Sequence, residues 1–228
     1  MKPRSPTVLI TGANRGIGLE LARQYAEAGW RVIGTARKPD QANALTGIGA
    51  EAMALDVADQ TSVERLAHAL TDQPIDVLIN NAGRQPLFWS LADIDFDEFE
   101  TVLRINTIGP VRVVRALLPN LRAGALRKVI NVSTNLSSMA GNDEGGFYVY
   151  RESKAALNMF TRSLAAELGP EGFTCIVLHP GWVRTDMGGP DASLDAKESV
   201  VGIRRVIDDL RPTDNGSFWT YAGERMEW

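Results

Sequence analysis

Short runs of apolar and β-branched residues alternate along this chain with longer stretches in which apolar residues recur every three or four positions. The runs are continuously apolar rather than alternating with polar residues, which is typical of strands buried on both faces of a parallel sheet. The runs that predict strands are Thr7–Ile10, Arg31–Thr35, Glu51–Leu55, Asp76–Ile79, Lys128–Val132, Phe173–His179 and, more weakly, Phe218–Tyr221.

The stretches between these runs carry the spacing of amphipathic helices. They are Leu19–Ala28, Val63–Leu70, Phe96–Leu121, Lys154–Leu168 and Ala196–Leu210. Strand, helix and strand in repeated succession, joined by short turns, predict a parallel sheet with helices on both faces. The predicted fold class is therefore α/β, a doubly wound Rossmann domain with a mostly seven-stranded parallel sheet.

No linker, internal repeat or low-complexity tract divides the 228 residues, so we expect a single domain over residues 1–228. The least patterned part of the chain follows the sixth predicted strand and includes Gly188–Asp191. Open α/β sheets bind ligands beyond the carboxyl ends of their strands. Residues around 186–200 are therefore the predicted substrate lid.

Composition narrows the class of protein. The net charge of −4 argues against nucleic acid or an anionic membrane as the main partner, and no apolar stretch approaches the roughly 18 residues that span a bilayer. The first residues lack the apolar segment of a secretory signal, and a single cysteine, Cys175, excludes an internal disulfide. The two histidines, His68 and His179, do not indicate a metal site. These features predict a cytoplasmic protein without a metal.

A glycine-rich turn, Thr11–Gly18, follows the first predicted strand directly and opens the first predicted helix. Glycine allows a tight turn and a close approach of backbone to phosphate, and a helix N-terminus offers free N–H groups to an anion. The spacing is G-x-x-x-G-x-G, which differs from the general dinucleotide fingerprint G-x-G-x-x-G. The turn predicts a pyrophosphate site, and a turn that merely starts a helix is the alternative.

The end of the second predicted strand indicates which dinucleotide binds. NAD enzymes of doubly wound folds usually place an acidic residue there for the ribose 2′-OH, whereas NADP enzymes place an arginine. Here Arg37 and Lys38 follow the strand, and the first acidic residue is Asp40. Together with Arg15, these basic side chains are predicted to converge on a 2′-phosphate, which favours NADP(H). Two basic residues on a solvated surface are the alternative.

Tyr150 and Lys154 are four residues apart in a stretch with helical spacing, so both side chains should project from one face. A phenol titrates near pH 10, and a cation beside it favours phenolate and lowers its pKa. The pair therefore predicts a tyrosine activated by a neighbouring lysine. Taken alone, the pattern Y-x-x-x-K also occurs on ordinary protein surfaces.

Four short motifs, in this order and at these intervals, resemble those of the short-chain dehydrogenase/reductase family. They are the turn Thr11–Gly18, Asn80–Gly83 after the fourth strand, Tyr150–Lys154, and Pro180–Asp186 after the sixth strand. Residues 145–158 are similar to the branch that includes the C-factor signalling proteins and the sniffer-type carbonyl reductases. The resemblance covers nearly the whole chain.

The resemblance implies a role for each matching residue. Tyr150 would be the general acid that protonates a carbonyl oxygen, Lys154 would lower its pKa and hold the nicotinamide ribose, and Asn106 would hold a water of the proton relay. The residues expected at the cofactor are Gly12, Asn14, Arg15, Gly16, Ile17, Gly18, Arg37, Asp56, Val57, Asn80, Ala82, Gly83, Lys154, Pro180, Gly181, Val183 and Thr185. Structural roles for the asparagines, as a helix cap or a turn, are the alternative.

One position departs from the family pattern. The family usually ends its fifth strand with a serine pair, the second of which hydrogen-bonds the substrate carbonyl, whereas this chain reads Ser133-Thr134. Counting from the strand selects Thr134, and counting back from Tyr150 selects Ser137. Threonine supplies the same donor and acceptor with a stiffer side chain. We expect Thr134, with Ser137 as the second choice.

The predicted function is that of an NADPH-dependent reductase acting on a small carbonyl substrate, with an alcohol as product. A dinucleotide-binding signalling protein with incidental turnover is the alternative, and an NAD-linked alcohol oxidase is disfavoured by Arg37. The resemblance also implies a homodimer or homotetramer. Four large side chains are predicted either to line the substrate site or to form core or subunit contacts: Trp89, Phe147, Trp182 and Met187.

Overall fold

A computed structural model describes residues 4–86 and 90–228 of the chain. Its seven strands form one sheet in the order β3-β2-β1-β4-β5-β6-β7, and every neighbouring pair is parallel, which confirms the predicted fold class. The strands are β1 (Thr7–Ile10), β2 (Arg31–Ala36), β3 (Glu51–Ala54), β4 (Val77–Asn80), β5 (Lys128–Val132), β6 (Thr174–His179) and β7 (Phe218–Thr220).

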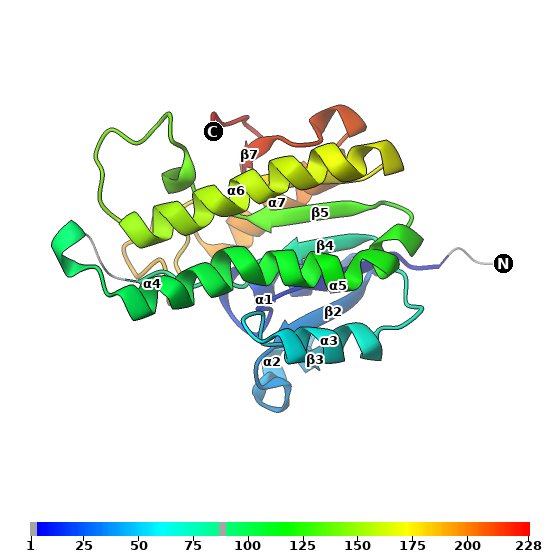
Figure 1. Cartoon of the computed structure of the whole chain (residues 1–228). Coiled ribbons are helices and arrows are strands. Elements are labelled where there is room, and N and C mark those ends of the chain that lie inside the picture. Colours follow the sequence, from blue (N-terminus) through cyan, green and yellow to red (C-terminus); the bar gives the residue numbers. More distant parts are fainter. Residues whose placement is uncertain (1–3, 87–89) are drawn as a thin grey trace.

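Helices cover both faces of the sheet, and α5 and α6 lie side by side across one of them (Figure 1). The helices are α1 (Gly16–Glu27), α2 (Asn43–Thr46), α3 (Gln60–Ala69), α4 (Phe96–Leu103), α5 (Gly109–Ala123), α6 (Tyr148–Leu168) and α7 (Ala196–Asp209). Within the described part of the chain, no helix has the length and apolar character needed to cross a membrane.

Burial on both faces explains why the central strands are continuously apolar. Successive side chains of a strand point to opposite faces. In β1, Val8 and Ile10 pack into the core beneath α1 and α7, whereas Leu9 packs into the core beneath α3, α5 and α6. All three side chains are completely buried, so neither face of the strand tolerates a polar residue.

The predicted helix Phe96–Leu121 is interrupted in the structure. Helix α4 ends at Leu103, a π-helical segment covers Arg104–Ile108, and α5 begins at Gly109. Pro110 accounts for the break, because proline has no N–H to donate to the carbonyl oxygen of Asn106 four residues earlier. The backbone N–H of Gly109 accordingly bonds to Arg104 O, five residues back. Single π-helical turns of this kind are frequent at functional sites.

The strand order reverses at β1, which has β2 on one side and β4 on the other. Ligands of doubly wound folds bind in the crevice at such a switch point. Here the two strand ends are tied together by Thr11, whose hydroxyl accepts hydrogen bonds from the backbone N–H groups of Asn81 and Ala82, both at 3.0 Å. The Asn81 side chain donates in return to Thr11 O at 2.9 Å. The predicted glycine-rich turn therefore lies at the switch point.

Candidate active site

The turn between β1 and α1 has a backbone that only glycine adopts readily. Gly12 and Gly16 have φ values of 66° and 53°, in the left-handed region. A Cβ on Gly18 would lie 2.3 Å from Gly12 O, closer than any side chain permits. The α1 N-terminus receives no side-chain cap from the described residues, and its first turn carries no acidic residue. Its uncapped N–H groups suit the pyrophosphate of a dinucleotide.

The segment after β6 closes over this turn. A Cβ on Gly16 would lie 3.2 Å from Thr185 Cγ2, and Arg15 Nη1 lies 2.7 Å from Asp186 Oδ2. Both side chains of this ion pair are largely exposed, so the pair contributes little stability. Arg15 is directed at Asp186 rather than at the end of β2. Arg37 is exposed and forms no ion pair with residues 4–86 or 90–228.

A cleft of about 510 Å³ lies beside the Arg15–Asp186 ion pair. Its lining residues are Arg15, Gly83, Arg84, Gln85, Pro86, Asp95, Glu98, Asp186 and Met187. Of the predicted apolar lining residues, Met187 lies in the cleft wall, Trp182 is exposed and donates its Nε1–H to Gly188 O at 2.8 Å, and Phe147 directly precedes α6. Trp89 lies outside the described residues.

The predicted lid region divides into two parts. The loop that follows β6 is closed at its base by a bridge between Val183 and Leu194, and Arg184 N donates to Leu194 O at 2.8 Å. Inside the loop, Gly188 N donates to Thr185 Oγ1 at 3.1 Å. Residues from Ala196 onward belong to α7. The loop proper therefore ends before that helix, and residues 196–200 are helical.

Helix α6 carries the predicted tyrosine and lysine on its buried face. Tyr150 is 8% exposed and Lys154 is 4% exposed, and Lys154 Nζ donates to Val132 O at the end of β5 at 2.8 Å. A Cβ on Gly83 would lie 3.6 Å from Lys154 Nζ and 3.4 Å from Asn106 Oδ1. Residues from α6, the π-helical segment and the loop after β4 thus meet at one place, beside the cleft.

The predicted lowering of the Tyr150 pKa is wrong for this structure. Burial raises the pKa of Tyr150 to about 12 and lowers the pKa of Lys154 to about 8. The physical reason is that burial removes both groups from water, which disfavours the charged phenolate of Tyr150 and the charged ammonium of Lys154. At neutral pH the Tyr150 phenol therefore retains its proton.

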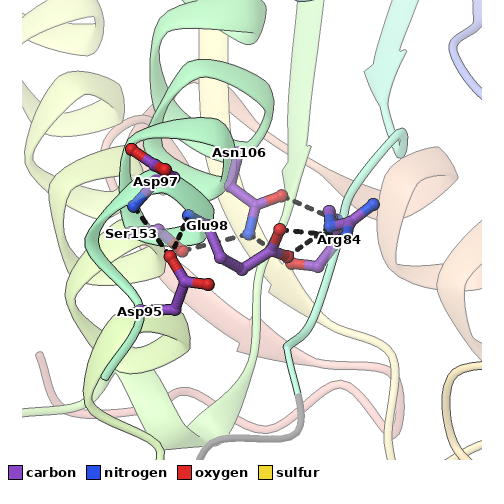
Figure 2. A network of polar contacts seen from close by, with 6 residues as sticks. All are labelled: Arg84, Asp95, Asp97, Glu98, Asn106 and Ser153. Carbon is purple, nitrogen blue, oxygen red and sulfur yellow. Dashed lines mark hydrogen bonds and ion pairs between the residues drawn. The ribbon is translucent and has the colours of Figure 1, made fainter. Parts of the chain in front are cut away.

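Asn106 is completely buried in the π-helical segment, and both polar atoms of its side-chain amide have hydrogen-bond partners (Figure 2). Nδ2 donates to Arg84 O at 2.8 Å and to Ser153 Oγ at 3.0 Å, while Oδ1 accepts from Arg84 N at 2.8 Å. Both amide hydrogens are used, so the amide nitrogen has no donor left for the predicted relay water.

Ser153 and Arg84 are site residues that the sequence analysis missed. Ser153 Oγ accepts from Asn106 and donates to Tyr150 O at 2.9 Å, so it joins two of the predicted catalytic residues. Arg84 directly follows the motif Asn80–Gly83. Ser153 could have been found from the sequence, because it lies three residues after Tyr150 and therefore on the same helix face.

The structure separates the two candidate hydroxyls. Ser137 Oγ donates to Thr134 O at 2.5 Å, accepts from Asn158 Nδ2 at 2.9 Å, and lies 3.1 Å from Ser133 Oγ. Thr134 Oγ1 has only longer contacts, accepting from Leu136 N and donating to Asn135 Oδ1, both at 3.2 Å. The Ser137 hydroxyl therefore belongs to a buried cluster of hydrogen bonds, whereas the Thr134 hydroxyl is held by longer and weaker ones.

The remaining predicted cofactor residues lie at strand ends. Asp56 follows β3, and its Oδ1 accepts from Ala58 N at 2.9 Å. Val57 is buried, and a Cβ on Gly109 would approach it to 3.0 Å. The Asn80 side chain donates to Asn131 Oδ1 at 2.8 Å. The side chain of Asn80 thus binds the neighbouring strand.

Gly181, in the motif after β6, has a φ of 84°, in the left-handed region. A Cβ there would lie 2.8 Å from Leu194 Cδ2 and 3.0 Å from Tyr221 Cε1. The neighbouring Pro180 O accepts a hydrogen bond from Ser199 Oγ at 2.6 Å. Glycine at this position lets the chain turn from the sheet into the loop that faces the cleft.

A doubly wound sheet whose switch point presents an uncapped helix N-terminus has the architecture of the dinucleotide-binding folds. The profile described as short chain dehydrogenase matches residues 6–194. The chain belongs to this family of oxidoreductases.

The relatives of this chain include a protein named C-signal and two carbonyl reductases. The C-signal of Myxococcus xanthus is 53% identical over 155 residues, which cover 68% of this chain and 93% of that protein. The carbonyl reductase Sniffer of D. melanogaster has a TM-score of 0.91 and 34% identity, covering 99% of this chain and 100% of its own. An NADPH-bound carbonyl reductase from chicken fatty liver has a TM-score of 0.90 and 32% identity, with the same coverage.

Proposed function

We propose that the protein is an NADPH-dependent reductase that converts an aldehyde, ketone or quinone into an alcohol. The observation that carries the proposal is the burial of Tyr150 and Lys154 on one face of α6. The phenol of Tyr150 holds its proton at neutral pH, which is the form that a general acid needs. The likeness to carbonyl reductases, one of them bound to NADPH, supports the assignment.

The residues present suit a dinucleotide with a 2′-phosphate. The uncapped N-terminus of α1 would hold the pyrophosphate, and Arg37 would pair with the 2′-phosphate. Asp56 and Val57 would lie beside the adenine, and residues 180–185 beside the carboxamide end. When bound, NADPH supplies the hydride, and the chain supplies the proton and the orientation of the substrate.

Each catalytic side chain has a distinct task in this proposal. Tyr150 donates its proton to the carbonyl oxygen, and Thr134 orients that oxygen through its hydroxyl. The ammonium of Lys154 stabilises the phenolate that Tyr150 becomes. We assign the relay water to the main-chain carbonyl of Asn106, because its amide hydrogens are bonded and Pro110 has no N–H to offer that carbonyl.

Replacing Arg37 by alanine tests the choice of cofactor. A lost guanidinium–phosphate contact corresponds to about 1.5–3 kcal/mol, or a rise of about 10- to 100-fold in the KM for NADPH. The KM for NADH should change little, because NADH carries no 2′-phosphate. Steady-state kinetics with both cofactors provides the measurement. An equal rise for both would show that Arg37 acts on the fold rather than on the phosphate.

Alanine at Thr134 and at Ser137 separates the two hydroxyls. Thr134→Ala should lower kcat/KM by about 10- to 100-fold with little change in stability, and Thr134→Ser should restore most of the activity. Ser137→Ala leaves the buried Asn158 amide short of a partner and should lower the free energy of unfolding by about 1–3 kcal/mol. Kinetics and urea denaturation of the three variants give both quantities. A larger kinetic loss in Ser137→Ala would reverse the assignment.

Fluorescence titration tests the cofactor part of the proposal directly. The chain contains five tryptophans, so NADPH and NADH binding can be followed by quenching of their emission. We expect NADPH to bind at least about tenfold more tightly, as one charge-assisted contact provides. Equal affinity for the two cofactors, or no binding of either, would remove the basis of the proposal.

The 53% identity to the C-signal favours a second candidate, a dinucleotide-binding signalling protein in which turnover is incidental. The presence of Tyr150, Lys154 and Asn106 supports the enzyme instead, because a binding protein has no need of a proton donor. Expression of Tyr150→Phe in a strain that lacks the native gene distinguishes the candidates. A signalling protein keeps its biological effect in this variant, and a reductase does not.

A further inference from the structure

Arg84 is held at three points, two on its backbone and one on its side chain. Its backbone N–H and C=O both bond to the amide of Asn106, and its guanidinium forms a two-point contact with the Glu98 carboxylate of α4 (Figure 2). The second of these two contacts, Arg84 Nη2 to Glu98 Oε2, measures 3.0 Å. Two parallel contacts of this kind fix the orientation of a guanidinium as well as its position.

These contacts form a continuous path from α4 to the catalytic helix. Glu98 holds the side chain of Arg84, the backbone of Arg84 holds Asn106, and Asn106 donates to Ser153. Ser153 donates in turn to Tyr150 O. The path therefore joins three neighbouring segments, the loop after β4, the start of α4 and the π-helical segment, to the first turns of α6.

Glu98 is well placed to anchor this path. It lies in the first turn of α4, and its side chain is only 18% exposed. Asp95 caps that helix independently, accepting from Asp97 N at 2.9 Å and from Glu98 N at 3.1 Å. The cap uses the backbone of Glu98 and leaves its carboxylate free for Arg84. Removing the negative charge of Glu98 should therefore spare the helix.

We propose that the Glu98–Arg84 ion pair is a positioning device for the catalytic residues, acting through the Asn106 amide and Ser153 on Tyr150. Neither side chain needs to touch the substrate for this role. Arg84 keeps the backbone groups that orient the amide, and Glu98 keeps Arg84 in place. The inference rests on the proposed reductase function for its kinetic test, and its structural part is measured without turnover.

The chain contains a matched control for this ion pair. Arg122, in α5, forms the same two-point contact with Glu171, at 2.7 and 2.8 Å. Arg122 and Glu171 lie shortly before the amino ends of β5 and β6, at the opposite end of the sheet from the site. Glu171→Gln therefore removes an equivalent ion pair without touching the path to Tyr150.

The kinetic test compares Glu98→Gln with Glu171→Gln. We expect Glu98→Gln to lower kcat about tenfold, with the KM for carbonyl substrate nearly unchanged, because a misplaced catalytic group loses rate rather than affinity. Glu171→Gln should retain native kcat. The single variants Arg84→Glu and Glu98→Arg should each lose rate, and the double variant that combines them should recover most of it. A higher KM with native kcat would show instead that these side chains bind substrate, which overturns the positioning role.

Amide hydrogen exchange of Arg84, followed by NMR, tests the same inference without substrate. The Arg84 N–H is bonded to the buried Asn106 Oδ1. In Glu98→Gln its exchange should accelerate about tenfold, because the segment that carries it loses its anchor, and in Glu171→Gln it should not. Unchanged exchange in Glu98→Gln would contradict the inference. Accelerated exchange in a protein that reduces no carbonyl would support the structural path and reject the reductase function.

Discussion

Tyr150→Phe is expected to lower kcat for carbonyl reduction by about 10²- to 10⁴-fold, the range over which a positioned general acid contributes. The substitution removes one oxygen from a side chain that is 8% exposed and forms no hydrogen bond through that oxygen with the described residues. Stability should therefore change little. Cofactor affinity should also be retained, because phenylalanine keeps the ring in place.

Tyr148→Phe is the matched control for this prediction. Tyr148 stands two residues earlier in the same helix, and its side chain is 36% exposed. Its loss of a hydroxyl should leave kcat near the native value. Stopped-flow measurement of NADPH oxidation in both variants provides the comparison. Native turnover in Tyr150→Phe would show that another group supplies the proton.

Lys154→Met is expected to lower kcat by about 10²-fold and, at pH 7, to stabilise the fold. Burial lowers the pKa of Lys154 from 10.5 to about 8, so the folded protein binds the ammonium proton less tightly than the unfolded chain does. Such a shift lowers the free energy of unfolding by up to about 3 kcal/mol at pH 7. Methionine removes this cost, partly offset by the lost bond to Val132 O.

The sign of this effect sets its pH dependence. The folded-state pKa lies below the unfolded value, so the destabilisation is complete below about pH 8 and disappears as the pH rises toward 10.5. The stability difference between Lys154→Met and the native protein should shrink over that window in urea denaturation. Native kcat should likewise fall as the pH rises through about 8, where the ammonium loses its charge. Lys128→Met, at the opposite end of the sheet, is the control, and equal kinetic loss there would contradict the role of Lys154.

The sequence predicted the sheet well because the central strands β1, β4, β5 and β6 are buried on both faces. Leu9 and its neighbours in β1 must all be apolar, and this leaves a continuous pattern that is easy to recognise. The starts of helices were less predictable. Helix α6 begins at Tyr148, before the apolar spacing that marks Lys154–Leu168, because its first turn carries residues of the site rather than of the core. Residues of the site occupy positions in that turn where the apolar spacing of a helix would otherwise be visible.

The interruption of the long helix before α5 shows a different limit. Apolar spacing runs through residues 96–121 without a break, and it cannot distinguish an α-helix from one that contains a π-helical turn. Pro110 was the available indication, since its missing N–H faces the carbonyl of Asn106. The consequence for the site is direct, because the π-helical segment carries the amide that holds Arg84 and Ser153.

The sequence predicted the identity of the site residues better than it predicted their burial and their contacts. Tyr150, Lys154, Asn106 and Gly83 were predicted from short motifs, and the last three meet in the structure. The pKa of Tyr150 was misjudged because burial cannot be measured from spacing. Contacts between distant segments, such as Arg15 with Asp186, depend on the three-dimensional path of loops that carry no periodic pattern.

In the proposed reaction, hydride passes from NADPH to a carbonyl carbon while Tyr150 supplies the proton to its oxygen. The most direct test follows NADPH absorbance together with alcohol formation, using native protein and Tyr150→Phe against quinones, dicarbonyls and aldehydes. We predict NADPH consumption and alcohol formation in equal amounts for at least one of these substrate classes, with both lost in Tyr150→Phe. Tight NADPH binding without turnover of any carbonyl would contradict the claim and favour the signalling protein.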